Sequence, residues 1–371
     1  MEHLFGKSEY SQETNEASLV MLLDRVLSKN PQAVMLLCCD NDLESRDFFE
    51  PILSSMTIPI FGGIFPAIIV NEEVKEQGIL VVPVHTSVEL KIYQGLEHAP
   101  ANQFDFSFSL PSCQSAMILI DGLSRNIDFA LNQLFQQFGQ TLNVFGGGAG
   151  SLSFEQKPCL FSNQGILSDA MVVVFMQQPW ELAIGHGWEI LEGPFLANEV
   201  DDNRIIQLNF QPALDVYQKV VEQFDGRQFS EYDFFELAKA YPFGLERLDD
   251  DLLVRDPVTV EQDSLVCVGK VPENTMLYIL KGQNANLITA AVDAVKHVVK
   301  KNGSDQGLLF DCISRQLFLE DEFAQELQGV SSALGRSELI GALVLGEIAS
   351  GISGAIHFHN KTAVTAVAGN V

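Results

Sequence analysis

The residues with the clearest capacity for chemistry lie in the segment Phe310–Arg315 and in the pair His357 and His359. Cys312 becomes a nucleophile only if a base or a positive neighbour converts its thiol to a thiolate. Arg315 could supply the charge, and either histidine could supply the base. The pattern therefore predicts either thiol chemistry or, more simply, a buried cysteine at the end of a strand.

Arg315 is also a candidate for binding a carboxylate. Its guanidinium is a planar fork of donors, and it comes just past the end of a predicted strand. Glu347 follows a second predicted strand nearby and could hold an amine. The alternative is that Arg315 forms a structural ion pair with Glu347 or with another acid.

The two histidines are also candidates for binding a metal. His357 and His359 alternate along a predicted strand, so both imidazoles fall on one face. No third ligand lies within local reach, and Asn360-Lys361 is typical of a hairpin turn. Cys38-Cys39 lacks the spacing of a CxxC redox pair. We therefore expect neither a metal nor a cofactor.

A glycine run at Phe145–Ser151 follows a predicted strand, as a dinucleotide fingerprint would. Ser151 stands where the third glycine belongs, and Leu152–Leu167 predicts a hairpin instead of a helix. Without a helix N-terminus there is no dipole to hold a pyrophosphate. The run predicts either a closely approached strand end or a small-ligand cleft that uses backbone N–H groups.

The elements that must position these residues recur three times. Each copy has an apolar run, a helix, a second apolar run with glycines and a hairpin. The first apolar runs begin at Ala33, Ala116 and Gly307. The helices are predicted near Leu43–Ser55, Ile127–Phe138 and Asp321–Leu334. Amphipathic helices over Leu19–Leu27 and Asn286–Lys300 precede the first and third copies.

This order of elements predicts an α/β fold with α+β character, in which internally repeated units form mixed β-sheets with flanking helices. Mixed sheets are expected because a hairpin follows each glycine-containing strand. Residues 222–250 are polar, aromatic and acidic, which suggests a domain boundary near 210–225. We predict a first domain over 15–221, with two copies, and a second over 222–368, with the third.

The composition limits the class of partner. The chain has 371 residues, of which 22 are Lys or Arg and 49 are Asp or Glu, so its net charge is −27. That field repels phosphate backbones and anionic lipid, which argues against nucleic-acid and membrane partners. No signal peptide or apolar run of about 20 residues is visible. The six scattered cysteines suggest a reducing cytoplasm.

An ordered set of short motifs resembles the FIST sensory family (F-box and intracellular signal transduction proteins), in both its N-terminal and C-terminal parts. The motifs cover roughly 15–368 and are Gly147-Gly-Ala-Gly150, Gly185-His-Gly-Trp188, Pro212–Tyr217, Tyr241-Pro-Phe-Gly244, Leu253-Val-Arg255, Asp311–Arg315, Gly346-Glu-Ile348 and His359-Asn360. Ser151 departs from the acid that the family often carries there. The kinase, cyclase or chemotaxis outputs often fused to such modules are absent from this sequence.

The resemblance implies a cytoplasmic sensory protein that binds a small ligand, such as an amino acid or a similar polar metabolite, and signals through a separate output partner. In this interpretation Arg315 pairs the ligand carboxylate and Glu347 holds the amine. The other expected ligand-binding residues are Cys312, Asn360, His359, Gly147, Gly148, Gly150 and Arg255. The alternatives are a thiol-dependent or amide-cleaving hydrolase that uses Cys312, and an interaction scaffold that uses the acidic surface.

Overall fold

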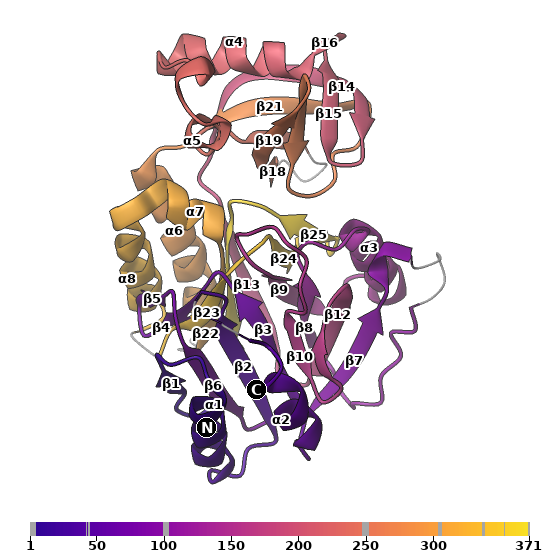
Figure 1. Ribbon diagram of the computed structural model, residues 1–371, viewed down its shortest axis with the longest axis vertical. Helices are drawn as coiled ribbons and strands as arrows, with labels where there is room; N and C mark the ends of the chain where they lie inside the picture. Colours follow the sequence, from indigo (N-terminus) through magenta and orange to yellow (C-terminus); the bar gives the residue numbers. More distant parts are fainter. Residues whose placement is uncertain are drawn as a thin grey trace.

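A computed structural model describes residues 5–41, 43, 45–98, 104–246, 252–302, 306–335, 338–351 and 353–369. It has two parts (Figure 1). The larger part, here called the core body, contains three six-stranded sheets and both chain termini. The smaller part, here called the β-lobe, comprises the elements between Glu189 and Lys281 and has one eight-stranded sheet.

The three sheets of the core body follow one plan. Each has a parallel pair at its centre, an antiparallel strand beside the first strand of that pair, and a hairpin beside the second. The first sheet runs β1 (Glu9–Ser11), β6 (Ile79–Val84), β2 (Ala33–Cys39), β3 (Ile60–Phe65), β10 (Leu160–Ser162) and β11 (Gly165–Leu167). The second runs β7 (Val88–Gln94), β12 (Ala170–Met176), β8 (Ser115–Asp121), β9 (Asn143–Ala149), β24 (Glu347–Ser350) and β25 (Ile356–His359). The third runs β13 (Trp180–Gly185), β26 (Ala363–Ala368), β22 (Gly307–Cys312), β23 (Ile340–Val344), β4 (Ala67–Val70) and β5 (Glu73–Lys75).

The hairpin that completes each sheet comes from a different copy of the repeat. Hairpin β4–β5 of the first copy pairs with β23 of the third. Hairpin β10–β11 of the second pairs with β3 of the first, and hairpin β24–β25 of the third pairs with β9 of the second. The three copies therefore close into a ring in which each supplies edge strands to a neighbour.

This exchange bears on the predicted domains. Two of the three exchanged hairpins join strands on opposite sides of the predicted boundary at 221–222. The boundary itself falls within helix α4 (Ala213–Asp225). The division of the chain into two folding units at this boundary stays a prediction. The sheets of the core body contain strands from both sides of the boundary.

Buried apolar strands explain why the sheets assemble. Every residue of β2, β8 and β12 is buried, and their sequences are nearly continuous apolar runs, as expected for strands covered on both faces. Helices pack beside them (Figure 1). These helices are α1 (Glu16–Leu27), α2 (Phe49–Ser55), α3 (Ile127–Phe138), α6 (Asn284–Asn302), α7 (Ile313–Leu319) and α8 (Phe323–Ala333).

The predicted mixed sheets with flanking helices are confirmed, with local differences. Helix α7 was not predicted. It begins directly after Cys312, the last residue of β22, with no loop between strand and helix to mark its start. The predicted helix near Leu43–Ser55 is regular only as α2. The chain passes from the core body to the β-lobe between Gly185, where β13 ends, and Glu189, where β14 begins.

The β-lobe is a twisted antiparallel sheet carried by one long strand, β14 (Glu189–Asp201), which pairs with two neighbours. The other strands are β15 (Arg204–Leu208), β16 (Gln211–Pro212), β17 (Phe243–Glu246), β18 (Leu252–Arg255), β19 (Pro257–Glu261), β20 (Ser264–Cys267) and β21 (Thr275–Lys281). Helices α4 and α5 (Phe234–Ala238) belong to this part. The chain returns to the core body directly after β21, at the start of α6.

One glycine in each central strand pair allows the two backbones to approach closely. A Cβ atom at these positions would lie 1.7, 1.8 or 1.9 Å from a carbonyl oxygen of the facing strand. The pairs are Gly62 with Leu36, Gly146 with Ile118, and Gly341 with Leu309. The repeated glycines are therefore explained by strand packing at equivalent positions of the three copies.

We predict that Gly146→Ala lowers the free energy of unfolding by about 3 kcal/mol or more, because its Cβ has no space beside the Ile118 carbonyl. Gly226→Ala is the control, since Gly226 also has a positive φ (84°) but no packing neighbour among the described residues within 4 Å of the place that its Cβ would take. It should lose only about 1–2 kcal/mol. Equal losses in urea titrations would contradict the packing explanation.

Candidate functional site

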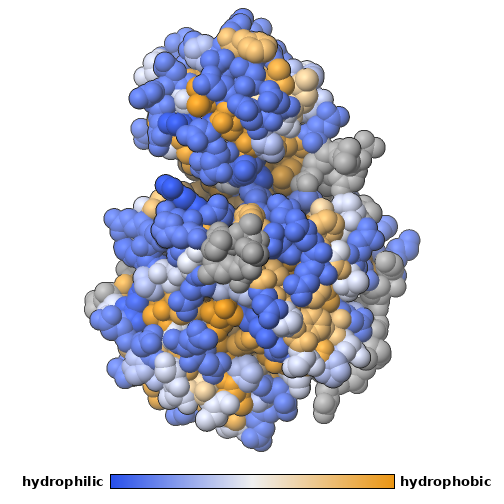
Figure 2. Space-filling view, turned by 90° about the vertical axis from the view of Figure 1, so that its right-hand side faces the viewer, coloured by the Kyte–Doolittle hydropathy of each residue, from blue (hydrophilic) through white to orange (hydrophobic). Residues whose placement is uncertain are grey.

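A cleft of about 1970 Å³ lies between the core body and the β-lobe. The space-filling view shows the waist between the two parts (Figure 2). The core body contributes the start of α3, the residues around Leu345 and strand β25, while the β-lobe contributes β18 and the segment Cys267–Lys270. A site between two connected parts is a common place for a small ligand.

Arg255, the last residue of β18, is a buried charge that lines this cleft. Its side chain is 2% exposed. Nε donates to the Lys270 carbonyl at 2.8 Å, and Nη1 donates to the carbonyls of Val254 at 3.1 Å and Phe358 at 2.8 Å. These bonds fix the guanidinium across the interface, because Phe358 belongs to the core body.

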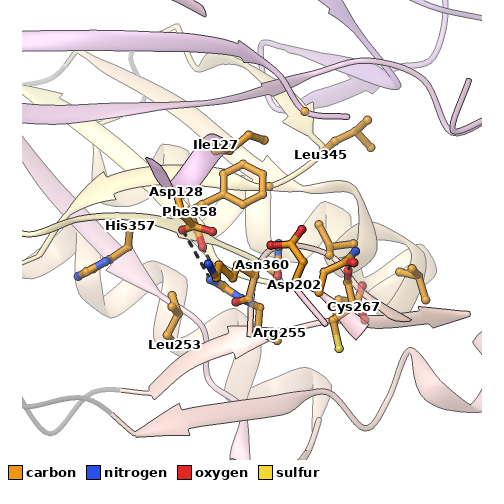
Figure 3. Close-up of a pocket in the computed structure, with 18 of the residues that line it drawn as sticks. Ile127, Asp128, Asp202, Leu253, Arg255, Cys267, Leu345, His357, Phe358 and Asn360 are labelled. Atoms are coloured by element: carbon orange, nitrogen blue, oxygen red, sulfur yellow. Dashed lines mark hydrogen bonds and ion pairs between the residues drawn. The ribbon is translucent and has the colours of Figure 1, made fainter. Parts of the chain in front are cut away.

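The remaining nitrogen of Arg255 faces the cleft. Its Nη2 lies 4.0 Å from Asp128 Oδ1, which is a long contact for an ion pair (Figure 3). Gly269 packs close to the guanidinium, since a Cβ there would lie 3.3 Å from Arg255 Cζ. Burial lowers the pKa of Arg255, and the Asp128 carboxylate opposes that shift. The arrangement leaves one edge of a buried cation for an anionic group.

Asn360 supplies a complementary acceptor. Figure 3 shows it beside Arg255 in the cleft. The residue is 1% exposed, and its Nδ2 donates to the His359 carbonyl at 2.9 Å. Its Oδ1 is buried and has no hydrogen-bond partner in the described part of the chain. A buried unpaired acceptor is costly, so Asn360 is a natural place for an N–H or O–H donor of a ligand.

Helix α3 points its N-terminus into the same cleft. Asn126 precedes the helix in a left-handed conformation (φ 62°) and does not cap it. Its side chain donates instead to the carbonyls of Leu96 and Glu97, each at 3.0 Å. The uncapped first turn and the helix dipole favour a negative group nearby, a requirement that Asp128 partly meets.

A buried ion pair joins the two parts directly behind this polar group. Lys361 Nζ lies 3.1 Å from Asp256 Oδ1 and donates to the Lys239 carbonyl at 3.0 Å. Its ammonium also lies 5.4 Å from the ring centroid of Trp188 and 5.7 Å from that of Phe235. Burial raises the pKa of Asp256, and Lys361 opposes the shift. The pair therefore locks the core body to the β-lobe.

The side chain of Arg315 bonds acceptors of the protein itself. It is fully buried and does not line the cleft. Its Nη2 bonds Glu326 at 2.5 Å and its Nε lies 3.3 Å from Asp311 Oδ1. Its other acceptors are the carbonyls of His186, Lys361 and Leu287. The acid partners are Glu326 and Asp311 instead of Glu347, and a ligand carboxylate would have to displace them.

Glu347 and Cys312 form a second buried contact of the third copy. Glu347 Oε2 accepts from the Thr362 N–H at 3.1 Å, and its side chain also bonds Cys312. Burial raises the pKa of Glu347. Burial, followed by the charges of Glu347 and Asp256, also raises the pKa of Cys312 well above its ordinary value. Cys312 lines the cleft as a protonated thiol, the opposite of an activated nucleophile.

The predicted glycines lie behind the cleft and do not line it. Gly147 and Gly148 are inside β9, and a Cβ there would meet Val344 or the Leu345 carbonyl at 2.5–2.7 Å. Gly150 packs in the same way against the Leu345 side chain. Because Val344 and Leu345 cover them, the backbone of this run faces protein.

Of the two histidines, only His357 lines the cleft. His357 lines it, whereas His359 pairs with Glu347 across β24 and β25. Their ring centroids are 5.8 Å apart. Of the nine predicted ligand residues, the cleft thus gathers Arg255, Asn360 and Cys312.

The sequence-based prediction missed Asp128, Asp256 and Lys361. Asp256 directly follows Arg255, and Lys361 directly follows Asn360, so adjacency to predicted residues was the available signal. Lys361 was assigned only to a hairpin turn, where a lysine is normally solvated. Only the packing of the β-lobe on that turn buries it.

The part of the chain that the structure describes contains neither a metal-binding cluster nor a membrane-spanning helix. No set of three His, Cys, Asp or Glu side chains among those residues is arranged to hold a metal ion. Within the same ranges, none of the helices combines the length and the apolar composition that a membrane span requires.

We predict that Lys361→Met lowers the free energy of unfolding by about 3–5 kcal/mol, because it leaves Asp256 buried without its cation. Lys296→Met is the control, since Lys296 is 61% exposed and pairs with Asp293 on the surface. It should change stability by less than about 0.5 kcal/mol. Denaturant unfolding measures both, and similar small losses would contradict the locking role.

Comparison with known proteins assigns the whole arrangement to one family. A search of the curated proteins found no match. Two family models do match, the FIST N domain over residues 17–211 and the FIST C domain over residues 213–350. FIST domains are sensory domains of signal transduction. The first match ends at Gln211 in β16 and the second begins at Ala213, the first residue of α4, so both boundaries lie inside the β-lobe. The chain therefore belongs to the FIST family, and carries the N-terminal and the C-terminal FIST domain in sequence.

Proposed function

We propose that this protein is a cytoplasmic sensor that binds a small polar metabolite, such as an amino acid, in the cleft between the core body and the β-lobe. The observation that carries the proposal is the buried Arg255 guanidinium, which presents Nη2 to the cleft beside Asn360 Oδ1, an acceptor left unpaired by the described residues. A cation edge next to a free acceptor suits a ligand that has both a carboxylate and a donor group.

In this proposal the ligand carboxylate lies between Arg255 Nη2 and the uncapped start of α3. The N-terminal end of the helix dipole and the guanidinium both favour a negative charge at that place. The donor of the ligand, an ammonium or amide N–H, bonds Asn360 Oδ1. The role first predicted for Arg315 thereby passes to Arg255, because the donors of Arg315 serve the protein itself.

The position of the site suggests how binding is reported. Arg255 and Asp256 belong to the β-lobe, whereas Asn360 and Lys361 belong to the core body. A ligand held by Arg255 and Asn360 therefore acts beside the ion pair that joins the two parts. A ligand that prefers one arrangement shifts the population toward it. The output partner would recognise that arrangement.

The first test is a thermal-shift screen of the full chain with amino acids and small carboxylic acids. A ligand at about 100 times its Kd should add about 2.7 kcal/mol to the free energy of unfolding. Arg255→Lys should then weaken a carboxylate ligand by about 30-fold or more, because truncating a buried partner of a charge costs about 2–5 kcal/mol.

Arg227→Lys is the matched control for this variant. Arg227 also belongs to the β-lobe, but it is 44% exposed and pairs with Asp225. It should leave the Kd unchanged. A panel in which no compound moves the melting temperature would overturn the sensor proposal, and salt-sensitive capture of a basic protein would then favour the scaffold alternative.

The hydrolase alternative makes a separate prediction. Because burial raises the pKa of Cys312, iodoacetamide at a pH of about 7.5 should label it only when the protein unfolds. Cys113, which is half-buried, is the internal comparison and should react faster in the folded protein. Mass spectrometry of tryptic peptides measures both. Rapid labelling of Cys312 in the folded chain would restore the hydrolase alternative.

A further inference from the structure

We propose that the ligand carries an apolar tail in addition to its carboxylate, so that it is an amphipathic acid with an alkyl or aryl chain. This inference rests on the proposed function, because it takes the contact of Arg255 with a carboxylate as its starting point. It adds a second subsite, on the apolar wall of the same cleft.

The first observation is the size of the cleft. Its volume of about 1970 Å³ exceeds the roughly 300–1,000 Å³ of ordinary small-molecule sites. The polar group formed by Arg255, Asn360 and Asp128 occupies one region of this space (Figure 3). A ligand that touched only those residues would leave most of the cleft to water, although most of its lining surface is apolar.

The second observation is where the exposed apolar side chains lie. Among the described residues, three large ones line this cleft, namely Leu152 at 43%, Phe154 at 55% and Met276 at 45% exposure. Leu152 and Phe154 come from the segment after β9 of the core body, whereas Met276 comes from β21 of the β-lobe. Single exposed apolar residues are common, but several in one concave site indicate an apolar ligand group.

The third observation is the continuity between the polar and the apolar regions. Ile127 precedes Asp128 at the start of α3, and Phe129 follows it, so the helix that carries the acid also carries apolar lining. Figure 3 shows Ile127 and Leu345 on the same side of Arg255 as Asp128. A carboxylate at Arg255 therefore has apolar lining residues near it, along which a chain can extend.

These observations favour one small molecule over two separate ligands. The apolar and polar lining belong to one cleft, and the Arg255 side chain in it is buried. The head would fix position through Arg255, and the tail would cover side chains that now meet water. Each buried methylene is expected to strengthen binding about fourfold.

Titration calorimetry with a series of straight-chain acids tests the inference: acetate, butanoate, hexanoate and octanoate, below their micelle concentrations. From butanoate to octanoate we expect affinity to rise at least tenfold. Pentylamine and heptylamine carry the alkyl tails of hexanoate and octanoate without the carboxylate and should bind at least tenfold more weakly than these acids.

Phe154→Ser should remove most of the gain from the longer tail and leave acetate unaffected. Phe210→Ser is the matched control, because Phe210 is also exposed (76%) and also has a positive φ (62° against 54° for Phe154), but does not line the cleft. Leu152→Ser gives a second, independent reading of the tail subsite.

The outcomes separate this inference from the proposed function. Binding of short acids or amino acids with no dependence on tail length would overturn the tail subsite and keep the sensor. Equal effects of Phe154→Ser and Phe210→Ser, or equal affinities of amines and acids, would also overturn it. If neither these acids nor the amino-acid panel binds, both proposals fail.

Discussion

The core body depends on the exchange of hairpins among three copies of one unit. Each copy makes a parallel pair and one antiparallel neighbour, but its sheet is completed only when another copy adds β10–β11, β24–β25 or β4–β5. Open edges expose unpaired backbone groups, so an isolated copy would leave them unsatisfied. The glycines at 62, 146 and 341 permit the close strand pairing that makes the three copies equivalent.

The ring of three copies also determines where the polar residues of the third copy lie. Because β24–β25 must pair with β9 of the second copy, the turn that carries Asn360 and Lys361 is brought to α3 and to the base of the β-lobe. The β-lobe then covers that turn, and Arg255 bonds the carbonyl of Phe358 beside it. A site assembled in this way contains residues from both matched FIST domains.

Two buried arginines show how environment separates structural from recognition roles. Arg315 donates to carbonyls and to Glu326 and forms an ion pair with Asp311, so it is compensated within the protein. Arg255 is compensated mainly by carbonyls, and the acid that it faces, Asp128, lies 4.0 Å away. A buried cation whose counter-ion is distant has more to gain from an anionic ligand. The same residue type, at the end of β18 and in the first turn of α7, thus serves different purposes.

The sequence alone determined the repeated units and the mixed sheets, because local hydrophobic periodicity marks buried strands and amphipathic helices. The family followed from the resemblance of an ordered set of short motifs. Of the nine residues predicted from the sequence as ligand-binding, Arg255, Asn360 and Cys312 line the cleft. The sequence could not separate Arg255 from Arg315, or find the Lys361–Asp256 pair, because burial and counter-ions are set by segments far apart in the chain. Only the tertiary structure decided which charge the protein neutralises itself and which it leaves facing the cleft.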